Sequence, residues 1–198
     1  MQHRLLSIAI TLVLITAAQA RAEQTIVFLR HGEKPSGGYG QLTCQGLNRA
    51  LALPAVLIGK YGKPHYVYAP NPGVKIPDSA GSFNYVRPLA TIEPLAVKLG
   101  LPVNTKYGYS DIASLQASLI TSTKDNTASF VAWEHAYLVK VVQSIMNAYG
   151  GGVTVPAWIS GDYDSLYVVH VNYVGTTINA QFHRDVEGLN GQPTACPF

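Results

Sequence analysis

Charged residues are scarce in this sequence of 198 residues, and this scarcity excludes several classes of protein. Lys, Arg, Asp and Glu together make up 13% of the chain, against 47% hydrophobic residues. A disordered chain, or a protein that coats nucleic acid, needs far more charge than this. The length and composition instead suit one domain with a substantial buried core. We therefore expect no nucleic-acid partner.

Motifs for several common chemistries are also missing. The two cysteines, Cys44 and Cys196, do not form the CxxC or Cys-His pattern of a thiol nucleophile. The Gly-rich segment at residues 35–40 is not followed by the Gly-Lys-Ser/Thr of a nucleotide-binding P-loop. No histidines or acidic residues show the spacing of metal ligands. We expect neither a metal ion nor another cofactor.

Residues 1–22 have the pattern of a secretory signal peptide. A basic start at Arg4 precedes an apolar stretch, and overlapping small-residue sites predict cleavage after Ala20 or Ala22. The apolar stretch is shorter than a membrane span of ~20 residues, although an uncleaved anchor is the alternative. Cleavage after Ala22 removes two of the 14 Lys and Arg residues, which leaves 12 against 11 acidic residues and a net charge of +1.

The leader predicts a periplasmic or secreted protein that has no membrane contact after cleavage and folds as a single domain over residues 23–198. In such a compartment Cys44 and Cys196 can form one disulfide, although two unpaired thiols are the alternative. We favour the disulfide because the C-terminal sequence Ala-Cys-Pro-Phe has little else to hold it down.

Apolar strand-like runs alternate with amphipathic helical runs along the chain. Strands are predicted over residues 24–31, 65–70 and 129–135, a strand or an extended segment over residues 101–107, and helices over residues 42–62, 87–100, 111–120 and 136–150. Pro54 predicts a kink or a break in the first helix. This alternation favours a three-layer α/β/α sandwich with a mainly parallel central sheet. Residues 164–174 and 177–186 predict an antiparallel hairpin at the sheet edge, turning at Gly175 and Thr176.

Residues 71–86 form a long insertion in this pattern. They are rich in Pro, Gly and Asn. They lie between a strand and a helix, where an α/β sheet presents its ligand crevice. We interpret them as a surface loop over the site, and a loop that makes no contact with substrate is the alternative.

Two arginines and two histidines are expected at the same edge of the sheet. Arg30 and His31 end the first strand, Arg87 opens the helix after the second, and His135 ends the strand at 129–135. The carboxyl ends of parallel strands meet at one edge, where ligands bind. Arginine offers paired donors to phosphate oxygens, and a neutral imidazole can attack phosphorus. Each residue alone is more often structural, but the coincidence of all four favours a phosphate site.

Five segments, in order, resemble the motifs of the histidine phosphatase superfamily, which has the phosphoglycerate-mutase-like fold: FLRHGEKP, GQLTCQGLNRALAL, RPLATIEPLAVKLGL, VAWEHAYL and DYDSLYVV. The resemblance covers most of the chain after residue 22. It implies a metal-independent phosphatase that hydrolyses phosphomonoesters through a phosphohistidine on His31. It also implies that Arg30 and Arg87 bind the phosphoryl oxygens and that His135 contacts the same phosphate. The insertion replaces the family's short Ser-Pro turn before Arg87.

Protonation of the leaving group needs a carboxylic acid within reach, and three residues are candidates. Asp111 lies roughly where many family members place their acid, although a helix N-cap is the alternative. Glu134 adjoins His135, but on a regular strand it would face away unless the strand has already ended. Glu33 belongs to the first motif and can instead orient an arginine or the loop backbone. We rank Asp111 and Glu134 equally and Glu33 third.

The expected substrate is a small phosphorylated molecule, with phosphoprotein or pyrophosphate-type substrates as further options. Among enzymes the alternative is a phosphomutase, which export disfavours. The alternative from another class is a protein of the same fold that binds phosphate or a phospholigand without turnover.

Overall fold

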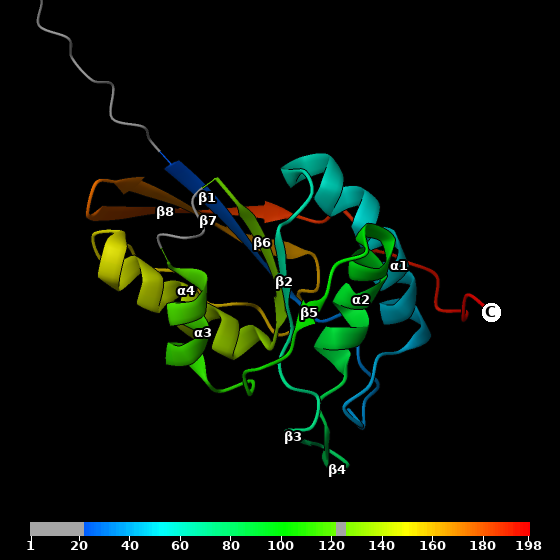
Figure 1. Ribbon diagram of the computed structural model, residues 1–198. Helices are drawn as coiled ribbons and strands as arrows, with labels where there is room; N and C mark the ends of the chain where they lie inside the picture. Colours follow the sequence, from blue (N-terminus) through cyan, green and yellow to red (C-terminus); the bar gives the residue numbers. More distant parts are fainter. Residues whose placement is uncertain (1–21, 122–125) are drawn as a thin grey trace, which may run out of the picture.

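A computed structural model of the chain describes residues 22–121 and 126–198. Within these residues a six-stranded sheet has the strand order β5-β2-β6-β1-β7-β8 (Figure 1). The strands are β1 (Ala22–Arg30), β2 (Tyr66–Tyr68), β5 (Val103–Asn104), β6 (Ala128–Trp133), β7 (Ser165–Val174) and β8 (Thr177–Val186). β5, β2, β6 and β1 pair in parallel, whereas β7 is antiparallel to both β1 and β8. This confirms the mainly parallel sheet with an antiparallel hairpin at its edge.

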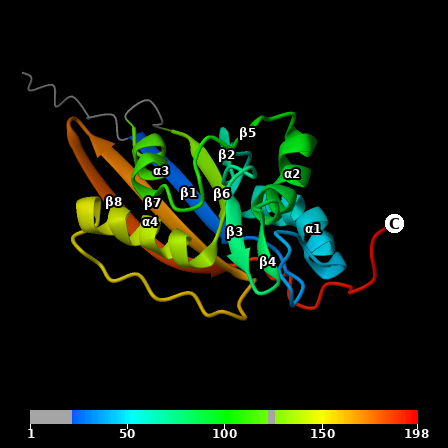
Figure 2. The ribbon, with the colours of Figure 1, turned by 90° about the horizontal axis from the view of Figure 1, so that it is seen from below.

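Helices cover both faces of the sheet (Figure 2). They are α1 (Cys44–Tyr61) and α2 (Arg87–Leu99) on one face, and α3 (Ile112–Leu119) and α4 (His135–Tyr149) on the other. Alternate residues of β1 serve the two layers: Val27 and Leu29 pack with α1 and α2, whereas Ile26 and Phe28 join the α4 side. Because both faces of β1 are buried, the three-layer α/β/α sandwich expected from the sequence is confirmed.

The signal peptide expected over residues 1–22 lies outside the described residues, apart from Ala22 at the start of β1. The structure narrows two expectations. Of the kink or break expected at Pro54, the break is wrong: α1 continues through Pro54, because Pro54 is buried on the packed face and tertiary contacts hold the helix across its missing amide. Of the strand or extended segment expected over 101–107, only Val103–Asn104 pairs as a strand, because the Asn104 side chain accepts from the Lys106 amide and turns the chain.

The insertion at 71–86 is more ordered than the loop expected from the sequence. It contains a second small sheet, the hairpin β3 (Lys75–Asp78) and β4 (Gly81–Asn84), which projects from the lower end of the molecule in Figure 1. Ile76 pairs with Phe83 across it, and Pro77 is tolerated because neither strand has another neighbour in the described residues. Asp78 ends β3, so the hairpin carries a carboxylate at its turn.

Gly40 joins the loop after β1 to the end of this insertion. Its carbonyl accepts from the amides of Val86 and Arg87, at 3.1 and 2.9 Å. Its φ is +66°, and a Cβ at this position would lie 1.9 Å from the carbonyl oxygen of Asn84. Only glycine fits this close approach. The contact fixes where α2 begins, and with it the backbone of Arg87.

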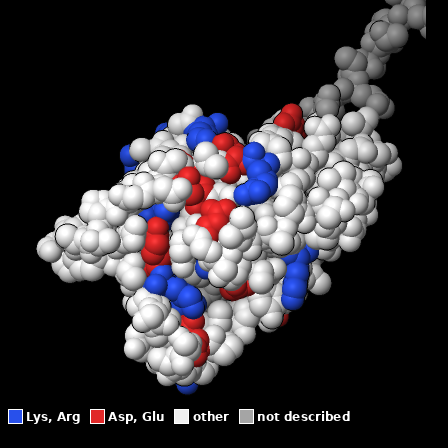
Figure 3. Space-filling model, turned by 180° about the vertical axis from the view of Figure 1, so that it is seen from behind, with Lys and Arg blue, Asp and Glu red and all other residues white. Residues whose placement is uncertain are grey.

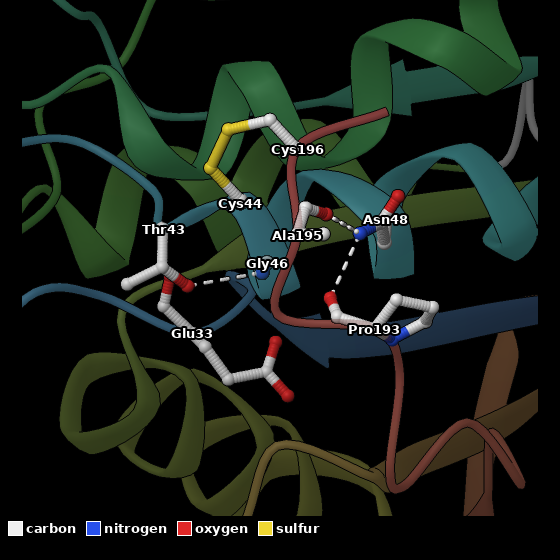
Figure 4. The surroundings of a disulfide bond; sticks show 8 residues. All are labelled: Glu33, Thr43, Cys44, Gly46, Asn48, Pro193, Ala195 and Cys196. Carbon is white, nitrogen blue, oxygen red and sulfur yellow. Dashed lines mark hydrogen bonds between the residues drawn. A yellow bond between two sulfur atoms is a disulfide. The ribbon is translucent and has the colours of Figure 1, made fainter. Parts of the chain in front are cut away.

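Cys44 and Cys196 form the disulfide favoured from the sequence (Figure 4). It attaches the C-terminal tail to the first residue of α1. The Asn48 side-chain amide adds two hydrogen bonds, to the carbonyl oxygens of Pro193 and Ala195, both at 2.8 Å. The tail therefore lies along the N-terminal half of α1 and is held there by covalent and polar contacts.

The described surface is mixed in charge. On the face shown in Figure 3, acidic and basic side chains lie next to one another and do not separate into patches of one sign. This agrees with the nearly balanced charge of residues 23–198. Among the helices of the described residues, none combines the length and apolar character needed to cross a bilayer.

Loss of the disulfide is expected to destabilise the protein without changing its fold. The bridge spans a sequence separation of 152 residues, and closing a long loop constrains mainly the unfolded chain. We expect Cys44→Ser/Cys196→Ser to lower the free energy of unfolding in urea by about 2–4 kcal/mol. Wild type treated with a thiol reductant should match the double variant, which should itself be insensitive to reductant. Equal stability of variant and wild type would contradict this prediction.

Candidate active site

The pairing of β1 with β6 assembles the centre of the site. Arg30, the last residue of β1, lies in register with Trp133, the last residue of β6. The His31 amide then donates to the Trp133 carbonyl at 3.2 Å. Glu134 and His135 follow directly at the start of α4. The strand ends therefore bring Arg30, His31 and His135 to one place, as their positions in the sequence predicted.

His31 is buried and is held in one tautomer. Its side chain is 2% exposed, and its Nδ1 lies 2.7 Å from the carbonyl oxygen of Gly32. Because a carbonyl oxygen only accepts, Nδ1 carries the proton and Nε2 keeps its lone pair. Burial lowers the pKa of His31 well below its ordinary value of 6.5, and the charges of Arg87, Arg30 and His135 lower it further. At neutral pH His31 is an uncharged imidazole with a nucleophilic Nε2.

Arg30 presents one edge of its guanidinium without a partner. Its Nη1 donates to the carbonyl oxygens of Ser160 and Asp162, which uses both Nη1 protons. The guanidinium lies over the Tyr163 ring, 4.0 Å from its centre. Its Nε is buried and has no hydrogen-bond partner in the described residues. The free edge of Arg30 is therefore the one formed by Nε and Nη2.

Arg87 is held in the same way, but by the insertion. Its Nη1 donates to Asp78 at 2.7 Å and to the Gly38 carbonyl at 3.2 Å, and its Nη2 donates to Asp78 at 3.3 Å. Asp78 also accepts from Lys34 and from the Gly40 amide. Although burial acts to raise the pKa of Asp78, these donors lower it to about 2. The Nε of Arg87 is buried without a partner in the described chain. Because Nη2 has two protons and Asp78 takes one of them, Nε and the second Nη2 proton form the edge that is left for a ligand.

Two arginines whose charges act on His31 thus keep the same edge for a ligand. A guanidinium binds an oxyanion through two parallel N–H donors, and the Nε–Nη2 edge supplies such a pair. A buried donor without a partner costs free energy, which a bound anion would recover. The arrangement suits a tetrahedral oxyanion, and the insertion at 71–86 reaches it through Asp78, which holds Arg87.

The segment after His31 is fixed by the N-terminal turns of two helices. The Gly32 amide donates to the Thr91 hydroxyl at 2.9 Å, and this hydroxyl donates to the Arg87 carbonyl at 2.8 Å. On the other side, a Cβ at Gly46 of α1 would lie 2.5 Å from the Glu33 carbonyl oxygen, so the two backbones are in close contact. These contacts leave His31 little freedom.

Of the three candidate acids, Glu134 adjoins His135 along the chain and contacts its side chain. β6 ends at Trp133, so the strand alternation that would turn Glu134 away does not apply. One carboxylate oxygen caps α4 by accepting from the Ala136 and Tyr137 amides, and the other lies 2.6 Å from Nδ1 of His135. Burial acts to raise the pKa of Glu134, but these partners outweigh it and the pKa is lowered. Glu134 is therefore ionised at neutral pH.

The other two candidates have different surroundings. Asp111 is exposed at the N-cap position of α3, where its carboxylate accepts from the Gly108 amide at 2.9 Å. Glu33 binds Arg49, which agrees with the alternative that it orients an arginine. No bond in the described residues joins either carboxylate to His31.

Arg49 was not anticipated from the sequence. It lies on the core-facing side of α1, with 0% exposure, and binds the carboxylates of Glu33, Asp164 and Glu187. Burial raises the pKa of Glu187 to about 8. A signal was present: Arg49 falls at helical spacing from Leu53, where a buried cation requires acidic partners. The cluster ties the segment after His31 to the chain that follows β8.

No family model matches the chain, and no curated protein matches it in sequence. Among solved structures the chain is similar to a mycobacterial glucosyl-3-phosphoglycerate phosphatase in complex with inorganic phosphate, with a TM-score of 0.53 and 14% identity over 80% of this chain and 95% of that one. It is also similar to a protein designated the phosphohistidine phosphatase SixA from Nakamurella multipartitia, with a TM-score of 0.51 and 15% identity over 82% of this chain and 95% of that one. At such identities the likeness establishes the fold alone: the chain shares the fold of these two proteins, which is the phosphoglycerate-mutase-like fold that its motifs predicted.

Proposed function

We propose that this chain is a phosphatase that transfers a phosphoryl group to Nε2 of His31 and then to water. The observation that carries the proposal is the pair of buried, unpartnered Nε donors of Arg30 and Arg87 beside a neutral His31. The fold, shared with proteins named as phosphatases, supports it. The substrate we propose is a small phosphorylated molecule.

In the first step the phosphoryl oxygens bind the free edges of Arg30 and Arg87. Nε2 of His31 attacks phosphorus, a P–N bond forms, and the bond to the leaving group breaks with its electrons going to the leaving atom. Arg30, Arg87 and His135 stabilise the charge on the transferring group. His135 is the first residue of α4, so the positive end of this helix adds to their field.

In the second step water attacks the phosphohistidine. Glu134, ionised in the resting protein, takes a proton from this water as the P–N bond breaks and its electrons return to Nε2. Phosphate then leaves and His31 is restored. When a phosphorylated substrate binds, its negative charge raises the pKa of Glu134, and this lets the same residue donate a proton to the leaving group in the first step. We therefore propose Glu134, rather than Asp111 or Glu33, as the acid and base.

The names of the two similar structures suggest which substrates to test. One similar structure is named for glucosyl-3-phosphoglycerate, a phosphate ester, and the other for phosphohistidine, so the fold is associated with both P–O and P–N substrates. A substrate panel for this chain should contain both classes, together with pyrophosphate and a phosphoprotein.

Phosphatase activity is tested with the protein lacking residues 1–22 and a generic aryl phosphate. We expect turnover that persists with a metal chelator, and its loss by at least about 10³-fold in His31→Ala, because the nucleophile is gone. Release of inorganic phosphate is the measurement. Tight binding of phosphate without turnover would contradict the proposal in favour of a binding protein. Transfer to a second sugar phosphate in place of water would favour a phosphomutase.

Replacement of Glu134 tests its proposed role. Glu134→Gln keeps an oxygen that can cap α4 but removes proton transfer, so we expect kcat to fall by about 10²- to 10⁴-fold. The loss should be larger for an alkyl phosphate than for an aryl phosphate, whose leaving group needs little protonation. Phosphorylated protein should accumulate and be visible by mass spectrometry. Asp111→Asn is the matched control and should retain activity. The reverse ranking of the two variants would assign the role to Asp111.

We also propose that the protein is exported to the periplasm or secreted. The leader at residues 1–22 supports this, and so does the Cys44–Cys196 disulfide, since such bonds persist in oxidising compartments. Expression of the whole sequence in a bacterium should yield, outside the cytoplasm, a chain that begins after Ala20 or Ala22. Mass spectrometry of the recovered protein measures this. Recovery of the full-length chain from the cytoplasm or membrane fraction would contradict export.

A further inference from the structure

The insertion brings a tyrosine into the candidate site. Tyr85 lies directly before Val86, the N-cap residue of α2, and it is 0% exposed. Its ring stands edge-on to the His31 ring, with 6.1 Å between their centres. The Arg87 guanidinium lies 4.9 Å from the centre of the same ring. Tyr85 is thus in contact with both the proposed nucleophile and a proposed phosphate-binding arginine.

The hydroxyl of Tyr85 is buried and has no hydrogen-bond partner in the described residues. Buried hydroxyls in folded proteins almost always have one, because an unpaired buried polar group costs free energy. The Arg87 side chain approaches the phenol oxygen as a donor, outside the geometry of a full hydrogen bond, and a guanidinium cannot accept the phenol proton. The phenol proton therefore lacks an acceptor in the described chain.

The ring contacts with His31 and Arg87 place Tyr85 in the candidate site. Burial raises the pKa of Tyr85 well above 10, while the charges of Arg87 and Arg30 act to lower it and that of Glu134 to raise it. Because the pKa is raised, the phenol keeps its proton at neutral pH and is available as a donor.

We propose that Tyr85 is a further substrate-binding residue, whose hydroxyl donates a hydrogen bond to an oxygen of the phosphoryl group. The inference rests on the proposed function, since it takes the anion beside His31 to be a phosphoryl group. Arg30 Nε, Arg87 Nε and the Tyr85 hydroxyl are three buried donors without partners in the described chain, and one phosphoryl group offers three non-bridging oxygens. The insertion, through Asp78 and Tyr85, then supplies part of the anion site.

A structural role and a ligand role for this hydroxyl predict opposite effects on stability. If it stabilised the fold, its removal would lower the melting temperature and leave phosphate affinity unchanged. If it awaits a ligand, its removal relieves an unpaired buried group and weakens binding. Tyr85→Phe makes this change alone, because the ring and its contacts with His31 and Arg87 remain.

The test compares Tyr85→Phe with wild type and with Tyr109→Phe, which makes the same change in the ring that packs on Tyr85 at 5.7 Å. Inorganic phosphate is the probe, and calorimetry measures its Kd. We expect Tyr85→Phe to weaken phosphate binding and lower kcat/KM by about 10- to 100-fold, as for a hydrogen bond to a charged group. Its melting temperature without phosphate should equal or exceed that of wild type. Tyr109→Phe should bind phosphate as wild type does.

Unchanged phosphate affinity in Tyr85→Phe, or a lower melting temperature with unchanged affinity, would overturn the inference. The binding measurement does not depend on turnover. If wild type binds phosphate without hydrolysing any substrate and Tyr85→Phe binds it more weakly, the phosphatase proposal fails and the role of Tyr85 stands. If wild type hydrolyses substrates and Tyr85→Phe equals it in both assays, only the role of Tyr85 fails. Absence of phosphate binding by wild type overturns both.

Discussion

The parallel pairing of β1 with β6 is the constraint on which the rest of the site depends. Its register places Arg30 opposite Trp133, the last residue of each strand. The chain then leaves both strands at the same point, so His31 and His135 cannot be far apart. The close packing on both faces of β1 fixes this register, because a shift by one residue would place Ile26 and Phe28 in the layer that is shaped for Val27 and Leu29. Packing in the centre of the sheet therefore determines the position of groups at its edge.

The hydrogen bonds around the two arginines determine how that edge can bind a ligand. Backbone carbonyl oxygens occupy Nη1 of Arg30, and Asp78 with the Gly38 carbonyl occupies Nη1 of Arg87. Each arginine keeps the Nε–Nη2 edge, and burial removes the water that would otherwise satisfy Nε. The same burial, together with both positive charges, keeps His31 neutral. The proposed anion binding and the proposed activation of His31 thus have one physical origin, the exclusion of water from a cluster of fixed cations.

The sequence predicted the parts of this site that depend on strand and helix ends. Arg30, His31, Arg87 and His135 lie at such ends, and the topology of a parallel sheet is enough to bring them together. It did not predict Asp78 and Tyr85, whose positions depend on hairpin register and on the contact of Gly40 with Asn84. The choice among the three acids depended on where β6 ends, a boundary that composition does not fix to one residue. The Arg49 cluster joins residues up to 138 positions apart, although a buried arginine on α1 was a visible signal.

The most direct test is to measure the protonation state of His31 as a function of pH by nitrogen NMR, on the isotope-labelled protein lacking residues 1–22. The account predicts a neutral ring with its proton on Nδ1 down to a pH well below 6.5. It also predicts that inorganic phosphate perturbs the Nε2 resonance and not only that of Nδ1. Two results together would contradict the claim that burial and neighbouring cations keep His31 neutral beside an anion site. These are protonation of His31 near pH 6.5 and an Nε2 resonance that does not change when phosphate is added.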